Sequence, residues 1–225
     1  MPGEIKTINL SLPFRLGSVN CYLLETGTGN ILIDTGCSNK RKDLVKELRS
    51  AGCQPGNLKL IVLTHGDFDH SCNAAYLHDR FGAEIAMHPD DSGIVERGNI
   101  CWNRKKWNIL IRIIAPVIFR FGKSQRFTPD HYIEEGCDLT IRGFNARVLH
   151  IPGHSKGSIG ILTADGDLFC GDLIVNRGKP RLNPLIDDRA AANTSIGRLK
   201  ELSIRTVYPA HGRPFPPGLL GKNKE

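Results

Sequence analysis

The chain has 225 residues, of which 40% are hydrophobic, and its 30 basic and 23 acidic side chains give a formal net charge of +7. We expect a single domain over residues 1–225, because this length can bury one substantial core, and the ordinary apolar content excludes a largely disordered chain. The moderate positive charge permits an anionic small molecule, a nucleic acid or an anionic membrane surface as partner, and it selects none of them.

The cysteines indicate the compartment. There are seven, and none forms a C-x-x-C pair; their odd number and long spacing argue against a disulfide framework and a structural zinc knuckle. Residues 1–14 lack the basic region and the apolar run of a signal peptide. We therefore expect a cytoplasmic protein.

The first half of the chain alternates strands and helices. Residues 30–34 are an apolar run that ends at Asp34-Thr35-Gly36, which is typical of a buried strand followed by a turn. In chain order we predict a strand over 30–34, a helix over 39–51, a strand over 58–64, a short helix through 74–77 that ends at Gly82, and a strand over 84–87.

The second half is richer in strands. We predict strands over 139–141, 146–150, 159–163, 168–170 and 206–208, and a helix over 190–202 with Ala192, Ile196 and Leu199 facing inward. Strands in two groups with intervening helices predict an α/β fold in which two packed sheets are covered by helices on both outer faces.

The segment at about 91–131 interrupts this pattern and is predicted to be a helical insertion. Pro116 predicts a kink or two short helices, and the apolar stretch is too short for a membrane span and contains Arg112. Packing or a homodimer contact is the favoured role of its apolar stripe, and a lid or wall over an apolar substrate is the alternative. The stripe consists of Trp107, Leu110, Ile111, Ile114, Ile118 and Phe121.

Side chains that bind metals occur at four places, each in a loop after a predicted strand. The first, His65-Gly66-Asp67-Phe68-Asp69-His70, has four potential ligands within six residues, which only a tight loop can direct to one point. His154, Asp172 and His211 follow later strands in the same manner. Alone, each is more typical of an exposed loop residue, but imidazoles and carboxylates together suit zinc, iron or manganese. His78, His88, His131 and His150 have no such surroundings and are interpreted as structural or surface residues.

This pattern resembles the metallo-β-lactamase superfamily, whose signature is H-x-H-x-D-H followed by a distant His, Asp and His. The resemblance runs from Asp34 to His211 and includes Ile33-Asp34-Thr35-Gly36, Leu63-Thr64-His65, Pro152-Gly153-His154-Ser155, Gly171-Asp172 and Pro209-Ala210-His211-Gly212. It implies a four-layer αββα sandwich of two mixed β-sheets flanked by helices. Within the superfamily, the chain looks most similar to hydrolase branches such as glyoxalase II and the lactonases.

Carried over by position, the resemblance implies two divalent metal ions, with zinc preferred and iron or manganese as alternatives. His65, Asp67 and His154 would hold the first metal, and Asp69, His70 and His211 would hold the second. Asp172 would bridge the two metals, and Asp69 and Asp172 are the carboxylates counted as catalytic. Asp34 would lie just behind the ligands as a hydrogen-bond partner.

One residue departs from the signature, because Asp67 stands where the family has its second histidine. In one interpretation Asp67 points away, and the first metal is weakly held or absent. In the other, three carboxylates instead of two face the metals, so the net charge of the site drops by one unit. That charge favours iron or manganese over zinc, and Asp67→His is then predicted to raise the share of bound zinc.

The expected chemistry is hydrolysis. Two metals about 3.5–4 Å apart can share a hydroxide and polarise a carbonyl or phosphoryl oxygen. We therefore expect a metal-bridging hydroxide to cleave an ester, thioester, lactone or related bond of a small, possibly anionic molecule. Lys156, Arg177, Lys179 and Arg181 are candidates for binding a carboxylate or phosphate, although solvated surface charge is the commoner role of such residues.

Three other functions remain as alternatives. A di-iron protein of oxygen or nitric oxide chemistry also carries an acidic residue at the second-histidine position, but such relatives need an electron-delivery module. A nuclease is suggested by the net charge, yet the basic residues are spread out without an aromatic platform, so no nucleic acid is expected as partner. A non-catalytic binding protein is disfavoured because every ligand position but one keeps its usual residue type. An iron-derived absorption band favours the first, and a salt-sensitive shift of an oligonucleotide favours the second.

Overall fold

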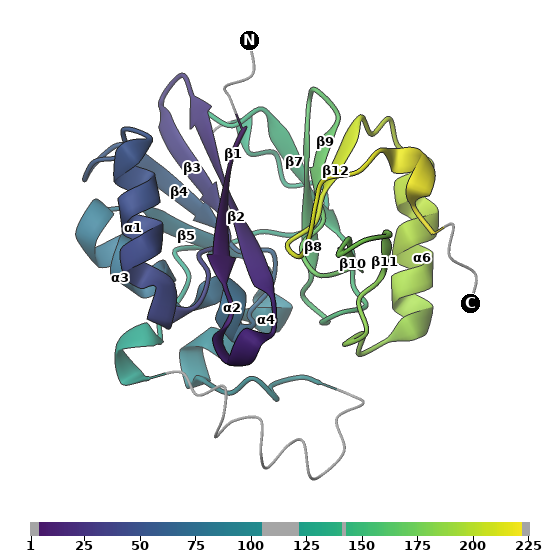
Figure 1. Ribbon diagram of the computed structural model, residues 1–225, viewed down its shortest axis with the longest axis horizontal. Helices are drawn as coiled ribbons and strands as arrows, with labels where there is room; N and C mark the ends of the chain where they lie inside the picture. The colour runs from purple at the N-terminus through teal and green to yellow at the C-terminus, as the bar shows by residue number, and fades with distance from the viewer. Residues whose placement is uncertain (1–4, 105–121, 141–142, 222–225) are drawn as a thin grey trace.

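A mixed β-sheet of six strands forms the N-terminal half of the fold (Figure 1). The computed structural model describes residues 5–104, 122–140 and 143–221. The strand order is β1-β2-β3-β4-β5-β6; the β1–β2 and β2–β3 pairs are antiparallel and the others are parallel. The strands are β1 (Ile5–Ser11), β2 (Ser18–Thr26), β3 (Gly29–Ile33), β4 (Leu58–Val62), β5 (Glu84–Met87) and β6 (His131–Tyr132).

A second mixed sheet of four strands has the order β12-β9-β8-β7, with β12 and β9 parallel and the other pairs antiparallel. A separate two-stranded ribbon follows β9 in the chain. The strands of the second sheet are β7 (Ala146–His150), β8 (Ile159–Thr163), β9 (Asp167–Phe169) and β12 (Thr206–Tyr208), and those of the ribbon are β10 (Ile174–Val175) and β11 (Arg181–Leu182).

The alternation of side chains along the strands decides which layers form, because successive residues point to opposite faces of a sheet. In β3, Ile31 and Ile33 belong to the buried cluster that also contains Val148 and Ile161 of the second sheet. Leu32, between them, belongs instead to the cluster shared with the helices of the first half. The two sheets therefore pack face to face through one set of residues and use the other set to hold helices.

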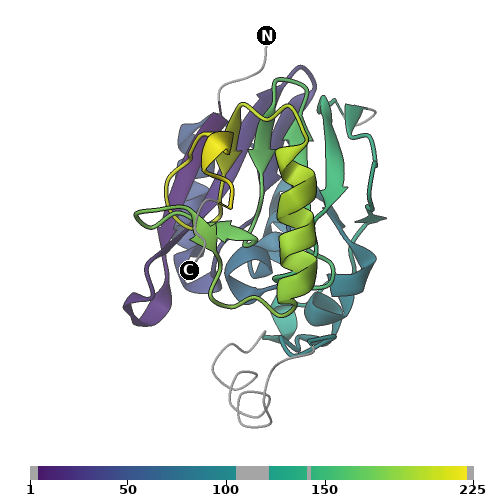
Figure 2. The ribbon, with the colours of Figure 1, turned by 90° about the vertical axis from the view of Figure 1, so that its right-hand side faces the viewer.

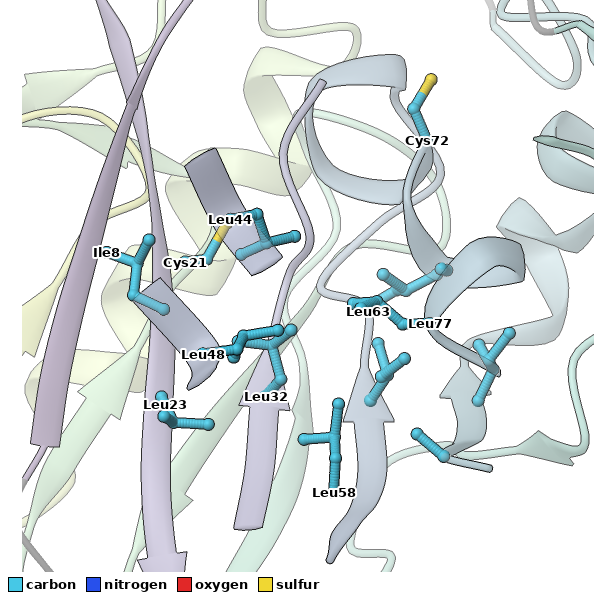
Figure 3. Packing of buried hydrophobic residues seen from close by; sticks show 14 of the residues in the cluster. Ile8, Cys21, Leu23, Leu32, Leu44, Leu48, Leu58, Leu63, Cys72 and Leu77 are labelled. Carbon is cyan, nitrogen blue, oxygen red and sulfur yellow. The ribbon is translucent and has the colours of Figure 1, made fainter. Parts of the chain in front are cut away.

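Helices α1 (Arg41–Ser50) and α3 (Ala74–Phe81) cover the outer face of the first sheet (Figure 1). Leu44 and Leu48 lie four residues apart and so share one face of α1, where both are fully buried (Figure 3). Leu77 of α3 is buried in the same cluster. Burial of each such leucine contributes about 1.5–3 kcal/mol, so this layer holds the strands that carry the loops of the site.

Helix α6 (Arg189–Lys200) covers the outer face of the second sheet (Figure 2). Asp188 caps it by accepting a hydrogen bond from the Ala191 N–H at 3.0 Å. Its buried residues include Ala192, Ile196 and Leu199, as predicted. The resulting order of helices, sheet, sheet and helix confirms the predicted αββα sandwich. The remaining helices among the described residues are α2 (Phe68–Ser71) and α4 (Pro89–Arg97), with 3-10 turns at Pro13–Arg15, Ser38–Lys40, Lys123–Gln125 and Pro217–Leu219.

The sequence predicted β5, β7, β8 and β12 with the observed bounds, but other elements differ. Strands β1 and β2 were not predicted. The predicted strand at 139–141 is wrong at its described residues, Leu139 and Thr140, which belong to no strand; the preceding residue, Asp138, forms an isolated bridge to Arg147. Within the predicted insertion at 91–131, the described residues are helical only over 91–97, which is most of α4, and at Lys123–Gln125. The apolar stripe from Trp107 to Phe121, with Arg112 and Pro116, lies outside the described residues. Within the described part, no helix is both long and apolar enough to cross a bilayer.

Candidate metal centre

The strand registers bring the four ligand-bearing loops to one edge of the sandwich. Ile33 pairs with Val62 and Val62 pairs with Ala86, so β3, β4 and β5 end level with one another. In the second sheet, Phe169 pairs in parallel with Tyr208, so β9 and β12 also end together. The loops after these strands carry Asp34, His65–His70, Asp172 and His211, and the loop between β7 and β8 carries His154.

Asp34 orients two of the histidines. Its Oδ2 accepts hydrogen bonds from His70 Nδ1 at 2.9 Å and from the Thr64 hydroxyl at 2.8 Å, and its Oδ1 accepts from the Thr64 N–H at 2.9 Å. Because the Thr64 hydroxyl donates its proton to Asp34, its oxygen accepts a hydrogen bond from His65 Nδ1, which lies 3.1 Å away. Both rings thereby carry their proton on Nδ1, and their Nε2 lone pairs point away from Asp34. Asp34 adopts a left-handed backbone (φ 59°), which brings its carboxylate under the loop.

His211 and Asp172 are held in a similar way. His211 Nδ1 donates to the Ser18 carbonyl at 2.7 Å, so its Nε2 is the free ring nitrogen. That Nε2 lies 3.3 Å from Asp172 Oδ1 and 3.5 Å from Asp69 Oδ2. Asn183 donates to the other oxygen of Asp172 at 2.8 Å. Asp172 Oδ1 is also 3.6 Å from His70 Nε2, and Asp172 Oδ2 is 3.9 Å from His154 Nε2, so Asp172 lies between the two groups of histidines.

Asp67 points into the site. Its Oδ2 lies 3.0 Å from His154 Nε2 and 3.7 Å from His65 Nε2. Its Oδ1 accepts a hydrogen bond from the buried guanidinium of Arg104. Sequence reasoning missed Arg104, because its partners are at positions 67 and 154 and nothing around Arg104 signals such a contact.

Buried atoms without partners indicate that this arrangement fits a cation. His65 Nε2, His70 Nε2 and Asp172 Oδ1 are buried and have no hydrogen-bond partner within the described part of the chain. Leaving such atoms unsatisfied costs about 1–3 kcal/mol each, and a bound metal ion would satisfy all three. Potential ligand atoms of His65, His154 and Asp172 lie within 4.8 Å of one another, and so do those of Asp69, His70 and His211.

The carboxylates change the protonation of the metal-free site. Burial alone would lower the pKa of His70, but Asp34, Asp69 and Asp172 raise it to about 9. Burial alone would also lower the pKa of His211, but Asp172 and Asp69 raise it to about 11. Near neutral pH a metal ion must therefore displace protons from both rings.

Another group with metal-binding side chains, His88, Asp90 and His150, lies elsewhere. The two imidazoles are stacked, with centroids 4.4 Å apart and planes 12° from parallel. Lone pairs in parallel planes do not converge on one ion. His88 Nδ1 instead accepts a hydrogen bond from the Asp90 N–H as the N-cap of α4, and His150 Nε2 binds the Lys156 carbonyl. These contacts agree with the structural role predicted for both histidines.

Asp91 is a further residue that sequence reasoning missed. It is buried, its Oδ2 accepts from the Gly66 N–H at 3.1 Å and the Ser155 hydroxyl at 2.6 Å, and its Oδ1 accepts from the Gly157 N–H at 2.8 Å. These bonds join the loop of His65 to the loop of His154. A buried aspartate in the first turn of α4 gave no local signal, because its partners lie in two distant loops.

A cavity of about 240 Å³ opens above the candidate ligands. Among the basic residues considered from the sequence, Arg177 and Arg181 line it. Lys156 instead forms an ion pair with Asp90 at 3.0 Å, and neither it nor Lys179 belongs to the described lining. The rest of the wall consists of Leu12, Leu16, Phe68, Ile100, Val175, Asn183, Pro184 and Leu185, over Asp67, Asp69, His154, Asp172 and His211.

Comparisons with known proteins agree with this geometry. Hydroxyacylglutathione hydrolase GloC of Haemophilus influenzae is 30% identical over 173 residues, covering 74% of this chain and 72% of that protein. The beta-lactamase-like protein 2 homolog of Caenorhabditis elegans is 26% identical over 202 residues, which cover 89% of this chain but only 58% of that relative. The crystal structure of TTHA1623 in a di-iron-bound form matches with a TM-score of 0.71 and 28% identity, covering 95% of this chain and 96% of that one. The family model of the metallo-beta-lactamase superfamily matches residues 14–211, and the chain belongs to that superfamily, as its motifs predicted.

Proposed function

We propose that the chain is a metal-dependent hydrolase with a two-metal centre. His65, Asp67 and His154 would hold the first ion, Asp69, His70 and His211 the second, and Asp172 would lie between them. The observation that carries the proposal is the set of buried, unpartnered atoms, His65 Nε2, His70 Nε2 and Asp172 Oδ1, among the described residues at one edge of the sandwich. No hydrogen bond from the described residues satisfies these atoms, whereas a bound cation would.

The chain's own residues prepare the site for hydrolysis. Two divalent ions held by these residues would supply an activated water molecule and would polarise the oxygen of the bond to be cleaved. Asp34 fixes the ring orientation of His70 directly and that of His65 through Thr64. Asn183 holds one oxygen of Asp172, so that its other oxygen faces the centre. These contacts keep the donor atoms in place before substrate arrives.

The cavity supports a small substrate with an apolar part and an anionic end. Its wall is apolar at Leu12, Phe68 and Ile100, and it also includes Arg177 and Arg181. Guanidinium groups bind carboxylates in a bidentate manner. An acylglutathione, named as the substrate class of the Haemophilus influenzae relative, is a thioester with carboxylates, and we propose thioesters of this kind as the substrate class.

A panel of substrates tests the proposal. Protein of measured metal content is assayed on a thioester with carboxylate groups, a neutral thioester, an ester, a lactone, a β-lactam and a phosphodiester. We expect hydrolysis of the anionic thioester, and loss of that activity in His154→Ala and Asp172→Ala. Lys156→Met, at a cation outside the described cavity wall, serves as the control and should keep full activity. Undiminished activity in His154→Ala would contradict the proposal.

Iron chemistry is the second candidate, because the similar TTHA1623 structure is in a di-iron-bound form. A protein that uses two irons for redox chemistry would show an iron-derived visible band and would change its spectrum with oxygen. Equal hydrolysis by zinc-loaded and iron-loaded protein, without a change of iron oxidation state during turnover, would favour the hydrolase.

A further inference from the structure

Arg104 is placed behind two of the candidate ligands. Only 5% of the residue is exposed. One amino group of its guanidinium, Nη2, donates to Asp67 Oδ1, and the other, Nη1, donates to the backbone carbonyl of His154. A guanidinium stays charged at any accessible pH. A permanent positive charge is therefore buried behind Asp67, separated from the proposed first metal by that one side chain.

The two carboxylate oxygens of Asp67 have different contacts. Oδ1 is occupied by Arg104, whereas Oδ2 faces the ring nitrogens of His154 at 3.0 Å and His65 at 3.7 Å. Only one oxygen of the carboxylate is thus directed to the point where the two imidazoles meet. A cation at that point would receive a single oxygen ligand from Asp67 unless Arg104 moved away.

The charges of the two side chains cancel. Asp67 carries one negative charge and Arg104 one positive charge, so the pair adds nothing to the net charge around the cation. Two further acidic groups lie near Arg104: Asp91, which is bound by Gly66, Ser155 and Gly157, and the buried Asp187. The charge count made from the sequence included three carboxylates and left out Arg104. With Arg104 included, the surplus negative charge at the site disappears.

We propose that Asp67 and Arg104 act as one neutral unit that takes the place of a neutral imidazole ligand at the first metal. Asp67 supplies one oxygen, and Arg104 is a positioning residue that cancels its charge and blocks its second oxygen. The inference rests on the proposed metal centre and reverses the expected effect of Asp67→His. A histidine at position 67 would leave the Arg104 cation beside a metal ion with no carboxylate between them.

Metal binding by paired variants tests this unit. The metal-stripped full-length protein and its variants Asp67→His, Arg104→Met and Asp67→His/Arg104→Met are titrated with zinc, and bound metal is measured by elemental analysis. We expect two equivalents in the wild type and one in Asp67→His, with the dissociation constant of the other site raised on the order of 100-fold. The double variant, in which a neutral ligand no longer faces a buried cation, should bind two again.

A second arm covers the case in which Asp67→His does not fold. In an equimolar mixture of zinc and manganese, Arg104→Met should bind a larger share of manganese, because its uncompensated carboxylate offers both oxygens and a surplus negative charge. Arg104→Lys keeps the charge and should stay near the wild-type ratio. Arg205→Met is the matched control, because Arg205 pairs with Asp167 at the opposite end of β9 from the site.

The outcomes separate the inference from the function on which it rests. Two equivalents at wild-type affinity in Asp67→His, or no recovery in the double variant, would overturn the neutral unit while leaving the metal centre intact. An unchanged zinc-to-manganese ratio in Arg104→Met would do the same. A wild type that binds no metal would overturn the proposed function itself.

Discussion

Replacing Asp34 by asparagine should reverse the proton position on His70 while keeping the fold. Asparagine has the same shape and tolerates the left-handed backbone that Asp34 adopts (φ 59°). Its amide oxygen can still accept from the Thr64 N–H, but its amino group now faces His70 Nδ1, which in wild type donates to Asp34 at 2.9 Å. The ring satisfies this new donor by moving its own proton to Nε2, which is the atom that faces the metal site.

The expected magnitudes follow from the contacts. Asp34→Ala removes three buried hydrogen bonds, each with a net contribution of about 1 kcal/mol, so it should lower the free energy of unfolding by about 3 kcal/mol. Asp34→Asn should lower it by about 1–2 kcal/mol. Because a metal-bound His70 must keep its proton on Nδ1, where it would face the amide N–H of the introduced asparagine instead of a carboxylate, zinc affinity in Asp34→Asn should fall about 10- to 100-fold, or about 1.4–2.7 kcal/mol.

Urea unfolding of the metal-stripped protein and competition with a zinc chelator measure the two effects separately. Asp43→Asn is the matched control, because Asp43 is an exposed residue in the first turn of α1 that pairs with Lys40. It should change neither quantity by more than about 0.5 kcal/mol. Unchanged zinc affinity in a folded Asp34→Asn protein would refute the reasoning about His70.

Three further predictions concern pH, backbone packing and substrate binding. Because the pKa values of His70 and His211 are raised above 6.5, to about 9 and about 11, their contribution to the stability of the metal-free protein is complete below pH 6.5. Its urea stability should fall as the pH rises through 9, and a curve that is flat from pH 6.5 to 10 would contradict this. Gly153→Ala should lower the free energy of unfolding by about 1–3 kcal/mol and weaken zinc binding, because at φ 148° the added Cβ would lie 2.5 Å from the Cβ of Ala192. Thermal unfolding tests this. The control is Gly197→Ala, where the added Cβ would meet no atom within 4 Å. Arg177→Met should raise KM about tenfold for an anionic thioester but not for a neutral one, and an equal effect of Lys179→Met would count against the cavity as the binding site.

The parts of the fold that were predicted from the sequence carry short-range signals. Apolar runs such as Ile159–Thr163 and Thr206–Tyr208 define buried strands, and the end of α3 before Gly82 follows from the left-handed glycine (φ 71°) there. The alternation of buried Ile8 and Leu10 with exposed polar residues is a signal of the same kind in β1. The strand predicted at 139–141 is wrong at Leu139 and Thr140, so a short apolar run alone does not establish a strand.

The candidate ligands were predicted because each stands in a recognisable sequence pattern, and the structure brings all of them to one site. Arg104 and Asp91 were not, since their roles arise from contacts with residues at least 25 positions away in the chain. Arg177 and Lys179 are both basic residues of the loop after Asp172, so their sequence context does not distinguish them. In the structure, Arg177 lines the cavity and Lys179 does not belong to its described lining. Sequence position therefore predicted the candidate ligands better than it predicted the residues that contact them or line the cavity.

The central claim is that the loops from His65 to His211 hold two metal ions. Anomalous diffraction from zinc-loaded crystals tests it most directly. The account predicts two peaks, one bounded by His65, Asp67 and His154 and the other by Asp69, His70 and His211, with Asp172 between them. A single peak, or peaks bound by other residues, would contradict it.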